Sequence, residues 1–274
     1  MNIIDLTDSY IKHILRNNDL SAYERSYPAL FGHYFKYWAR RKFFSKTLTK
    51  TEVKRRLDLL KPRLKIIEKN ICSLGFDTSH LDILLFVGQN TSNGHAFKDR
   101  KRFIAWIPIE TYETLLRVDV FITHEIVHAL HYTQSPDFYF HTFSEKRSTS
   151  RQLITEGLAT YLTMDIMNVN DGIALWADYL SKRELKIWLQ KCQQKERELN
   201  KFVLKNFSLS DPKATLFEVD DPNNIYEDRA GYFLGLSIIN QIVKVKKLNA
   251  KELLSMPRKK IEEMVLEQLE LNAI

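Results

Sequence analysis

The sequence contains few of the residues that interrupt helices or build disulfide frameworks. Its 274 residues include only 8 Gly, 7 Pro and 2 Cys. So few Gly and Pro favour a helix-rich protein with few tight turns. Cys72 and Cys192 lie far apart and form no paired ligand motif, which argues against a disulfide scaffold and a cysteine-based metal site. We expect both to be reduced, half-buried thiols on helices.

Long hydrophobic runs are also lacking. No stretch approaches the ~18 consecutive apolar residues that a membrane-spanning helix needs. Residues 1–8 have neither the basic start nor the apolar stretch of a signal peptide. These features predict a cytoplasmic protein without a membrane partner.

Charge of one sign is not concentrated anywhere in the chain. The net charge of +7 is modest, and Lys and Arg mix with Glu along the apparent helix faces. This pattern predicts a solvated surface rather than a nucleic-acid-binding stripe. The length allows a large core, either as one domain or as two lobes around a cleft.

Hydrophobic periodicity divides the chain into three regions, which we expect to form one compact unit. Residues 1–80 and 171–274 have the pattern of helices, and residues 81–170 combine strands with helices. The fold class expected from this order is α+β.

Two capping boxes predict where helices begin. Thr49 and Glu52 precede a long amphipathic pattern, in which Pro62 is expected to introduce a kink. Thr149 and Gln152 precede a second apolar pattern and predict a second helix start there.

Two apolar runs, residues 81–87 and 103–109, predict strands. Pro108 cannot donate a hydrogen bond to a ladder, so we expect the second strand at a sheet edge. Such an edge can bind an extended peptide by strand addition, or it can be covered by the rest of the chain. Residues 89–95 between the runs predict a turn-rich loop. His95 in this loop is either a site residue or, more simply, an exposed histidine.

The motif His-Glu-x-x-His occurs within an apolar helical stretch, at His124, Glu125 and His128. On a helix the two histidines share one face, so both imidazoles can reach a single metal ion. Glu125 is rotated by about 100° and lies beside such a metal, where it can take a proton from bound water. This is the chemistry of a zinc metallopeptidase. The alternative is a pair of hydrogen-bonded core histidines.

A third ligand is expected from a carboxylate within another apolar helix. Glu156 lies in the middle of such a helix, where a buried carboxylate needs a cation, and Gly157 allows another group to approach closely. His131 is too near the histidine pair on the same helix to converge easily with it. His141 and Glu145, in a loop, remain possible.

Two segments together resemble the paired signatures of gluzincin metallopeptidases. They read His124-Glu125-Ile126-Val127-His128-Ala129-Leu130 and Thr155-Glu156-Gly157-Leu158-Ala159-Thr160-Tyr161-Leu162. The second is similar to the Asn-Glu-Gly-Phe-Ala-Ser-Tyr element of the aminopeptidase branch. With the later Gly231-Tyr232-Phe233-Leu234-Gly235, the chain is also similar to a bacterial group of predicted zinc-dependent proteases. The likeness covers roughly residues 82–240 and is specific at the two ligand helices.

The resemblance implies a zincin-like, thermolysin-type core with a small mixed or antiparallel sheet and additional helices. It implies Zn²⁺ held by His124, His128 and Glu156, and a peptide or protein substrate hydrolysed with Glu125 as general base. Two alternatives stay open: a zinc-bound peptide-binding protein without proteolysis, and a metal-free helical scaffold.

The resemblance also has departures. The Gly-x-Met-Glu-Asn element of the aminopeptidases is absent, so exopeptidase action is not implied. Thr160 occupies the position where thermolysin-like members carry an Asp that orients a histidine, so that partner must come from elsewhere or be a hydroxyl.

A further apolar helix is expected from Arg229 to about Val245. Gly231 and Gly235 share one face of it, which suits close packing against another helix. A Tyr or His stabilises the oxyanion in gluzincins, so Tyr232 is a candidate for that role, with a core tyrosine as the alternative. Arg229 is a weaker candidate for the same role or for binding a substrate carboxylate.

Overall fold

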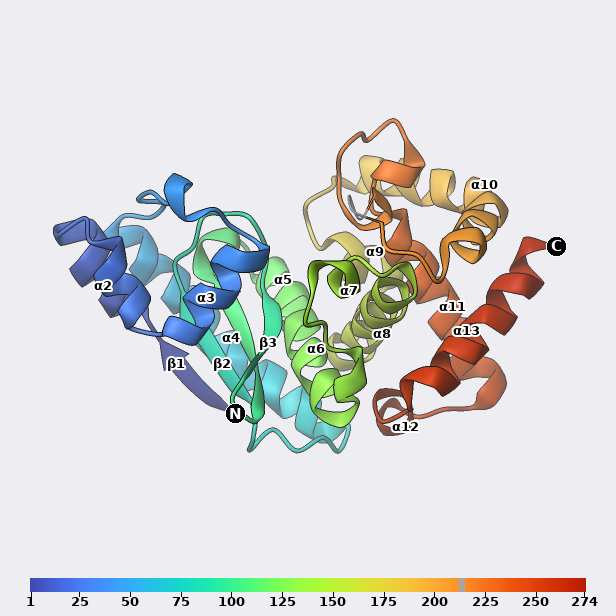
Figure 1. The fold of residues 1–274 in the computed structure, drawn as a ribbon, viewed down its shortest axis with the longest axis horizontal. Coiled ribbons are helices and arrows are strands. Elements are labelled where there is room, and N and C mark those ends of the chain that lie inside the picture. The colour runs from blue at the N-terminus through green and yellow to red at the C-terminus, as the bar shows by residue number, and fades with distance from the viewer. Residues whose placement is uncertain (212–214) are drawn as a thin grey trace. The chain divides into compact units, whose positions relative to one another are not determined.

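The computed structural model describes residues 1–211 and 215–274. They group into two compact units, Met1–Thr133 and Gln134–Ile274. The fold is helix-rich α+β, with a mixed four-stranded sheet in the first unit (Figure 1). The expected division into three regions stays a prediction.

The sheet has the strand order β1-β2-β4-β3. Strands β1, β2 and β4 run parallel, and β3 pairs antiparallel with β4. All five residues of β2 are buried, because helices cover both faces of the sheet, with α3 in front and α4 behind it in Figure 1. The bounds are β1 Asn2–Asp5, β2 Asp82–Phe86, β3 His95–Asp99, β4 Arg102–Pro108, α3 Pro28–Tyr37 and α4 Lys50–Ser73.

The two predicted strands are present, but three expectations about the sheet are wrong. β4 is not at an edge, because it lies between β2 and β3. Pro108 is tolerated there because it is the last residue of the strand. The edges are β1, in a stretch expected to be helical, and β3, which begins at His95 where a loop was expected. His95 is buried rather than exposed.

The long helix α4 begins as its sequence predicts. The Thr49 hydroxyl and the Glu52 carboxylate form the reciprocal bonds of a capping box, and the helix continues through Pro62. The other helices of the first unit are α1 Thr7–Tyr10, η1 Ile11–Arg16, α2 Leu20–Arg25, η2 Arg41–Phe43, η3 Ile109–Thr111, α5 Leu115–Arg117, η4 Val118–Ile122 and α6 Thr123–Gln134.

The second unit is helical throughout most of its described length. Its elements are η5 Pro136–Phe138, α7 Phe143–Lys146, α8 Thr149–Met167, α9 Asp171–Trp176, α10 Lys182–Asn206, η6 Thr215–Phe217, η7 Ile225–Glu227, α11 Ala230–Lys246, α12 Ala250–Leu254 and α13 Arg258–Ala273. The Ser148 hydroxyl caps α8 by accepting the N–H of Arg151, and Thr149 is the first residue of the helix. The capping box expected from Thr149 and Gln152 is therefore wrong.

Helices α8 and α11 approach each other at two glycines. A Cβ on Gly157 would lie 2.6 Å from the backbone carbonyl of Gly235, so neither position has room for a side chain. This confirms the close approach expected at Gly157 and at Gly235. Gly231 instead lies against the ring of Phe217 on η6.

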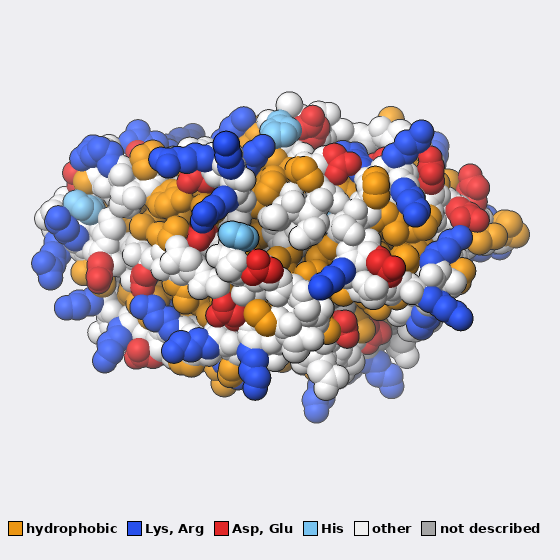
Figure 2. Space-filling model, turned by 90° about the horizontal axis from the view of Figure 1, so that it is seen from below, with side chains coloured by type: hydrophobic (Ala, Val, Ile, Leu, Met, Phe, Trp, Pro, Cys, Tyr) orange, Lys and Arg blue, Asp and Glu red, His pale blue; other side chains and the backbone are white. Residues whose placement is uncertain are grey.

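The cysteines, the surface charges and the hydropathy of the helices bear on three further expectations. Both cysteines are free thiols; Cys192 is buried and Cys72 is exposed rather than half-buried. On the face drawn in Figure 2, Lys and Arg side chains are interspersed with Asp and Glu. Among the described helices, none combines the length and the hydropathy that crossing a membrane requires.

Candidate metal centre

The two histidines of the motif lie on one face of α6, as their spacing predicts. His124 and His128 are buried, and their Nε2 atoms are 3.1 Å apart. Two ligands at ~2.0–2.1 Å from a tetrahedral zinc lie roughly 3.3 Å apart. This separation fits two ligands of a single ion, and it is also the distance of a hydrogen bond between the two ring nitrogens.

Other aromatic rings surround His128. The ring of Tyr132, one turn along α6, stacks at 5.8 Å between centroids, and the ring of His95 on β3 lies at 5.6 Å. His131 stacks on the other side of Tyr132 at 5.9 Å. These contacts hold the imidazole of His128 against the sheet, and they place His95 next to the motif.

The Glu125 side chain lies against the backbone of the loop between β2 and β3. A Cβ on Gly94 would be 2.8 Å from Cγ of Glu125, and Gly94 has a φ of +147°. Any side chain at this position would both strain the backbone and displace Glu125. Sequence reasoning noted the turn residues of this loop but not this contact.

The loop itself, residues 88–94, is held by a buried carboxylate. Glu110 on η3 accepts the backbone N–H groups of Gly88 and Asn90, each at 2.9 Å. The Tyr34 hydroxyl accepts the N–H of Gln89 at 2.8 Å. Burial raises the pKa of Glu110, although the two backbone donors act in the opposite direction. Three consecutive amides are therefore fixed by side chains from other elements.

Glu156 lies on α8, in the second unit, with 9% of its surface exposed. One turn later, the Thr160 hydroxyl donates to the backbone oxygen of Glu156 at 2.8 Å. The Thr160 hydroxyl is therefore bonded to the helix itself. Lys146 of α7 is half-buried, and desolvation lowers the pKa of its ammonium group to about 8, while the charges of Glu218 and Glu156 act in the opposite direction.

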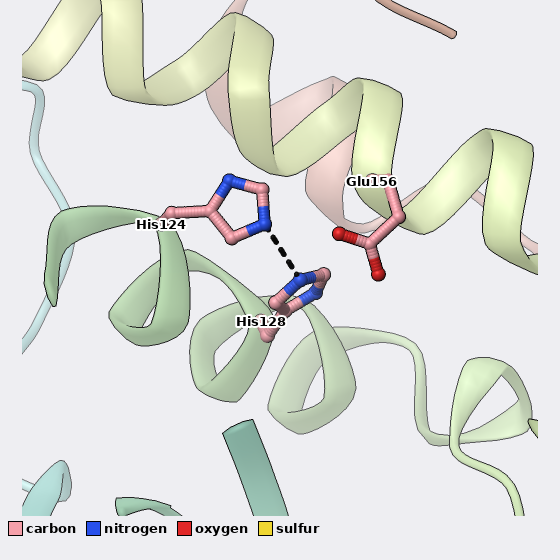
Figure 3. A group of neighbouring side chains, drawn as sticks. All are labelled: His124, His128 and Glu156. Carbon is pink, nitrogen blue, oxygen red and sulfur yellow. Dashed lines mark hydrogen bonds between the residues drawn. The ribbon is translucent and has the colours of Figure 1, made fainter. Parts of the chain in front are cut away.

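Three of the predicted residues form a group that could hold a metal ion. His124, His128 and Glu156 each offer one ligand atom, and these atoms all lie within 4.8 Å of one another (Figure 3). Two imidazoles and a carboxylate are a donor set that suits zinc, and three protein ligands leave a fourth position for water. No other such group occurs within residues 1–211 and 215–274.

The competing candidates for the third ligand lie outside this group. Glu145 closes a capping box on α7, accepting the N–H groups of His141 and Thr142. The pKa of the Glu145 carboxyl is lowered, and the hydrogen bond from the His141 N–H is the largest cause. His141 is exposed, and His131 contributes no atom to the group.

Arg229 and Tyr232 lie together at the start of α11. The Arg229 guanidinium carbon is 4.4 Å from the ring centroid of Tyr232 and 4.6 Å from that of Trp176. Arg229 also has a left-handed backbone, with φ of 58°. Stacking between two rings holds its guanidinium in place. The roles assigned to both residues stay predictions.

The comparisons with known proteins agree with the metal chemistry. A family model described as predicted Zn-dependent protease (DUF2268) matches residues 45–263, about four-fifths of the chain. The matched part includes both helices that carry the metal-binding group. No curated protein and no solved structure matches the chain.

Proposed function

Because the chain belongs to the family of predicted Zn-dependent proteases (DUF2268), we propose that it is a zinc peptidase of the gluzincin type. Zn²⁺ is the cofactor of this family, and the group of His124, His128 and Glu156 could bind it. That group is the observation that carries the proposal. The substrates of such a protease are peptides or proteins.

In this proposal Glu125 is the general base. Its carboxylate takes a proton from the attacking water and passes it to the leaving amine. Zn²⁺, when bound, supplies Lewis-acid polarisation and lowers the pKa of water. The absence of a side chain at Gly94 supports this role, because a Cβ there would come within 2.8 Å of Cγ of the buried Glu125 and displace it. Tyr232, aided by Arg229, stabilises the oxyanion.

We further assign the fold to the thermolysin-like zincins. This assignment is supported by the order of elements, in which a small mixed sheet precedes the helix with the His-Glu-x-x-His motif. The edge strand β3 takes the place of residues 103–109 as the strand that pairs with an extended substrate. β3 begins at His95, and the preceding residue, Gly94, lies against the side chain of Glu125.

One observation favours the metal-free alternative. The Nε2 atoms of His124 and His128 are 3.1 Å apart, which is the separation of a hydrogen bond between two core histidines. Metal binding separates the two functions, because a scaffold with hydrogen-bonded core histidines has no use for zinc.

The experiment is elemental mass spectrometry on purified protein, with His128→Ala as the test variant. We expect about one zinc per chain in the parent and loss of it in the variant, as a three-ligand catalytic site requires. His141→Ala is the matched control, since this exposed histidine was a rival ligand and is expected to leave the zinc content unchanged. A parent that neither contains zinc nor takes it up contradicts the proposal.

A further inference from the structure

We propose that a cavity lined by the loop that also approaches the general base is a substrate subsite that takes an aromatic side chain. The cavity has a volume of about 350 Å³ and is lined by Trp38, Arg40, Phe43, Gln89 and Thr91, among others. Ligand pockets occupy ~300–1,000 Å³, so this one suits a single bulky side chain. The assignment rests on the proposed peptidase function and names the substrate class for it.

The cavity and the general base lie on the same loop. Residues 88–94 connect the carboxyl end of β2 to the start of β3. Gln89 and Thr91 line the cavity, and Gly94, at the other end of the loop, is in contact with Glu125. A peptide that lies along this loop therefore contacts both.

Two ring contacts connect Trp38, which lines the cavity, to His128 and set an upper limit to the distance between their rings. The ring of Trp38 lies 4.7 Å from that of His95, which lies 5.6 Å from that of His128. An extended peptide advances about 3.3 Å per residue. A side chain two or three residues from the scissile bond would therefore reach the cavity.

The walls of the cavity are held in place before any ligand binds. Glu110 and Tyr34 bind the amides of residues 88–90, and the Tyr34 hydroxyl also bonds Oγ1 of Thr91 at 3.0 Å. Thr47, which also lines the cavity, donates its hydroxyl to the carbonyl of Gly88 at 3.0 Å. A preformed cavity favours binding because little ordering entropy is lost.

The lining indicates the chemistry of the occupant. Trp38 and Phe43 offer aromatic rings, and 62% of the Phe43 side chain is exposed beside the cavity. An incoming ring would remove this apolar surface from water and pack against both rings. The exposed guanidinium of Arg40 at the rim can stack on the same ring. Phe, Tyr or Trp is therefore the favoured residue.

The test measures peptide binding without cleavage. Zinc-loaded Glu125→Gln protein is titrated into dye-labelled Ala/Ser host peptides that carry one Phe at successive positions, and fluorescence anisotropy gives the affinity. We expect one position at which Phe binds about tenfold more tightly than Ala, which is the size of an aromatic contact. Adding Phe43→Ala is expected to remove this preference and leave the Ala host peptide unaffected.

A matched control is Phe143→Ala on α7, another exposed phenylalanine, at 53% exposure, outside the cavity. It is expected to retain the preference. Circular dichroism melts show whether Phe43→Ala is folded. Trp38→Phe, which shortens an aromatic wall and enlarges the cavity, serves as a second variant and is expected to weaken the preference. Equal binding of Phe and Ala peptides, or a preference that survives Phe43→Ala, overturns the subsite. Cleavage by the parent enzyme is scored separately, so the peptidase function and the subsite fail independently.

Discussion

Gly157 of α8 and Gly235 of α11 are in direct backbone contact, with 2.6 Å between a Cβ built on Gly157 and the carbonyl of Gly235. We predict that Gly157→Ala destabilises the protein by about 1–3 kcal/mol, because the helices must move apart. Denaturant unfolding measures the change. Gly32→Ala on α3 is the control, since a Cβ there meets nothing within 4 Å. It is expected to be neutral or stabilising by about 0.5–1 kcal/mol. Equal stability of the two variants contradicts the prediction.

The buried carboxylate of Glu110 predicts a pH dependence of stability. Burial raises its pKa above the ordinary value of 4.5, so the folded state holds its proton more tightly than the unfolded state does. The contribution to the free energy of unfolding is therefore fully present below 4.5 and is lost as the pH rises through the raised value. We expect Glu110→Gln to flatten this part of the stability–pH curve, measured by urea unfolding.

Glu145 supplies the opposite control for that measurement. Its pKa is lowered, chiefly by the His141 N–H, so its contribution is present above the ordinary value and is lost as the pH falls through the lowered one. Glu145→Gln is expected to remove some stability near neutral pH and none at strongly acidic pH. A Glu110→Gln curve parallel to that of the parent at all pH values is the result that would reject the Glu110 prediction.

Features that depend on neighbouring residues could be predicted from the sequence. The capping box at Thr49 and the facing histidines at 124 and 128 depend only on residues three or four positions apart. The two central strands were found because their buried runs are long and apolar. β1 and β3 were missed because β1 is only four residues long and β3 ends in charged residues, so neither carries a clear periodic signal.

Pairing between distant segments could not be predicted. The edge position expected from Pro108 was wrong because the rule applies to the middle of a strand and this proline ends one. Glu110 was missed, although it carries the signal that led to Glu156: a carboxylate next to a long apolar run. Its partners Gly88 and Asn90 are about 20 residues away, and no local pattern indicates which amides a buried carboxylate will bind.

Substitution of the general base and substitution of the third ligand are expected to affect activity and zinc binding differently. Glu125→Gln is expected to retain zinc and to lose activity by a factor of about 10²–10⁴, because proton transfer is removed while the ligands remain. Glu156→Ala is expected to bind zinc far more weakly, so that added zinc no longer raises its melting temperature. Isothermal titration calorimetry measures the zinc affinity of both variants, and a peptide-cleavage assay measures the activity of Glu125→Gln. If Glu156→Ala binds zinc as tightly as the parent, the ligand assignment is wrong.

The contact between Gly94 and Glu125 predicts a variant that keeps the metal but positions the base poorly. A Cβ at residue 94 lies 2.8 Å from Cγ of Glu125, and the φ of +147° is one that other residues rarely adopt. Gly94→Ala is therefore expected to displace the carboxylate, and a displacement of about 1 Å can cost about 10²-fold in rate. Zinc content is expected to stay near that of the parent, because the atoms nearest to the new methyl group belong to Glu125 and Trp106 and not to a ligand.

The pH profile of kcat/KM separates misplacement of the base from a general loss of structure. A displaced carboxylate lowers the rate and changes the acidic limb of the profile, since its surroundings set the pKa of the base. Partial unfolding lowers the rate equally at every pH at which the parent is stable, and Gly32→Ala shows the effect of a harmless methyl group. Gly94→Ala with parental kcat/KM contradicts a close fit between the loop and Glu125.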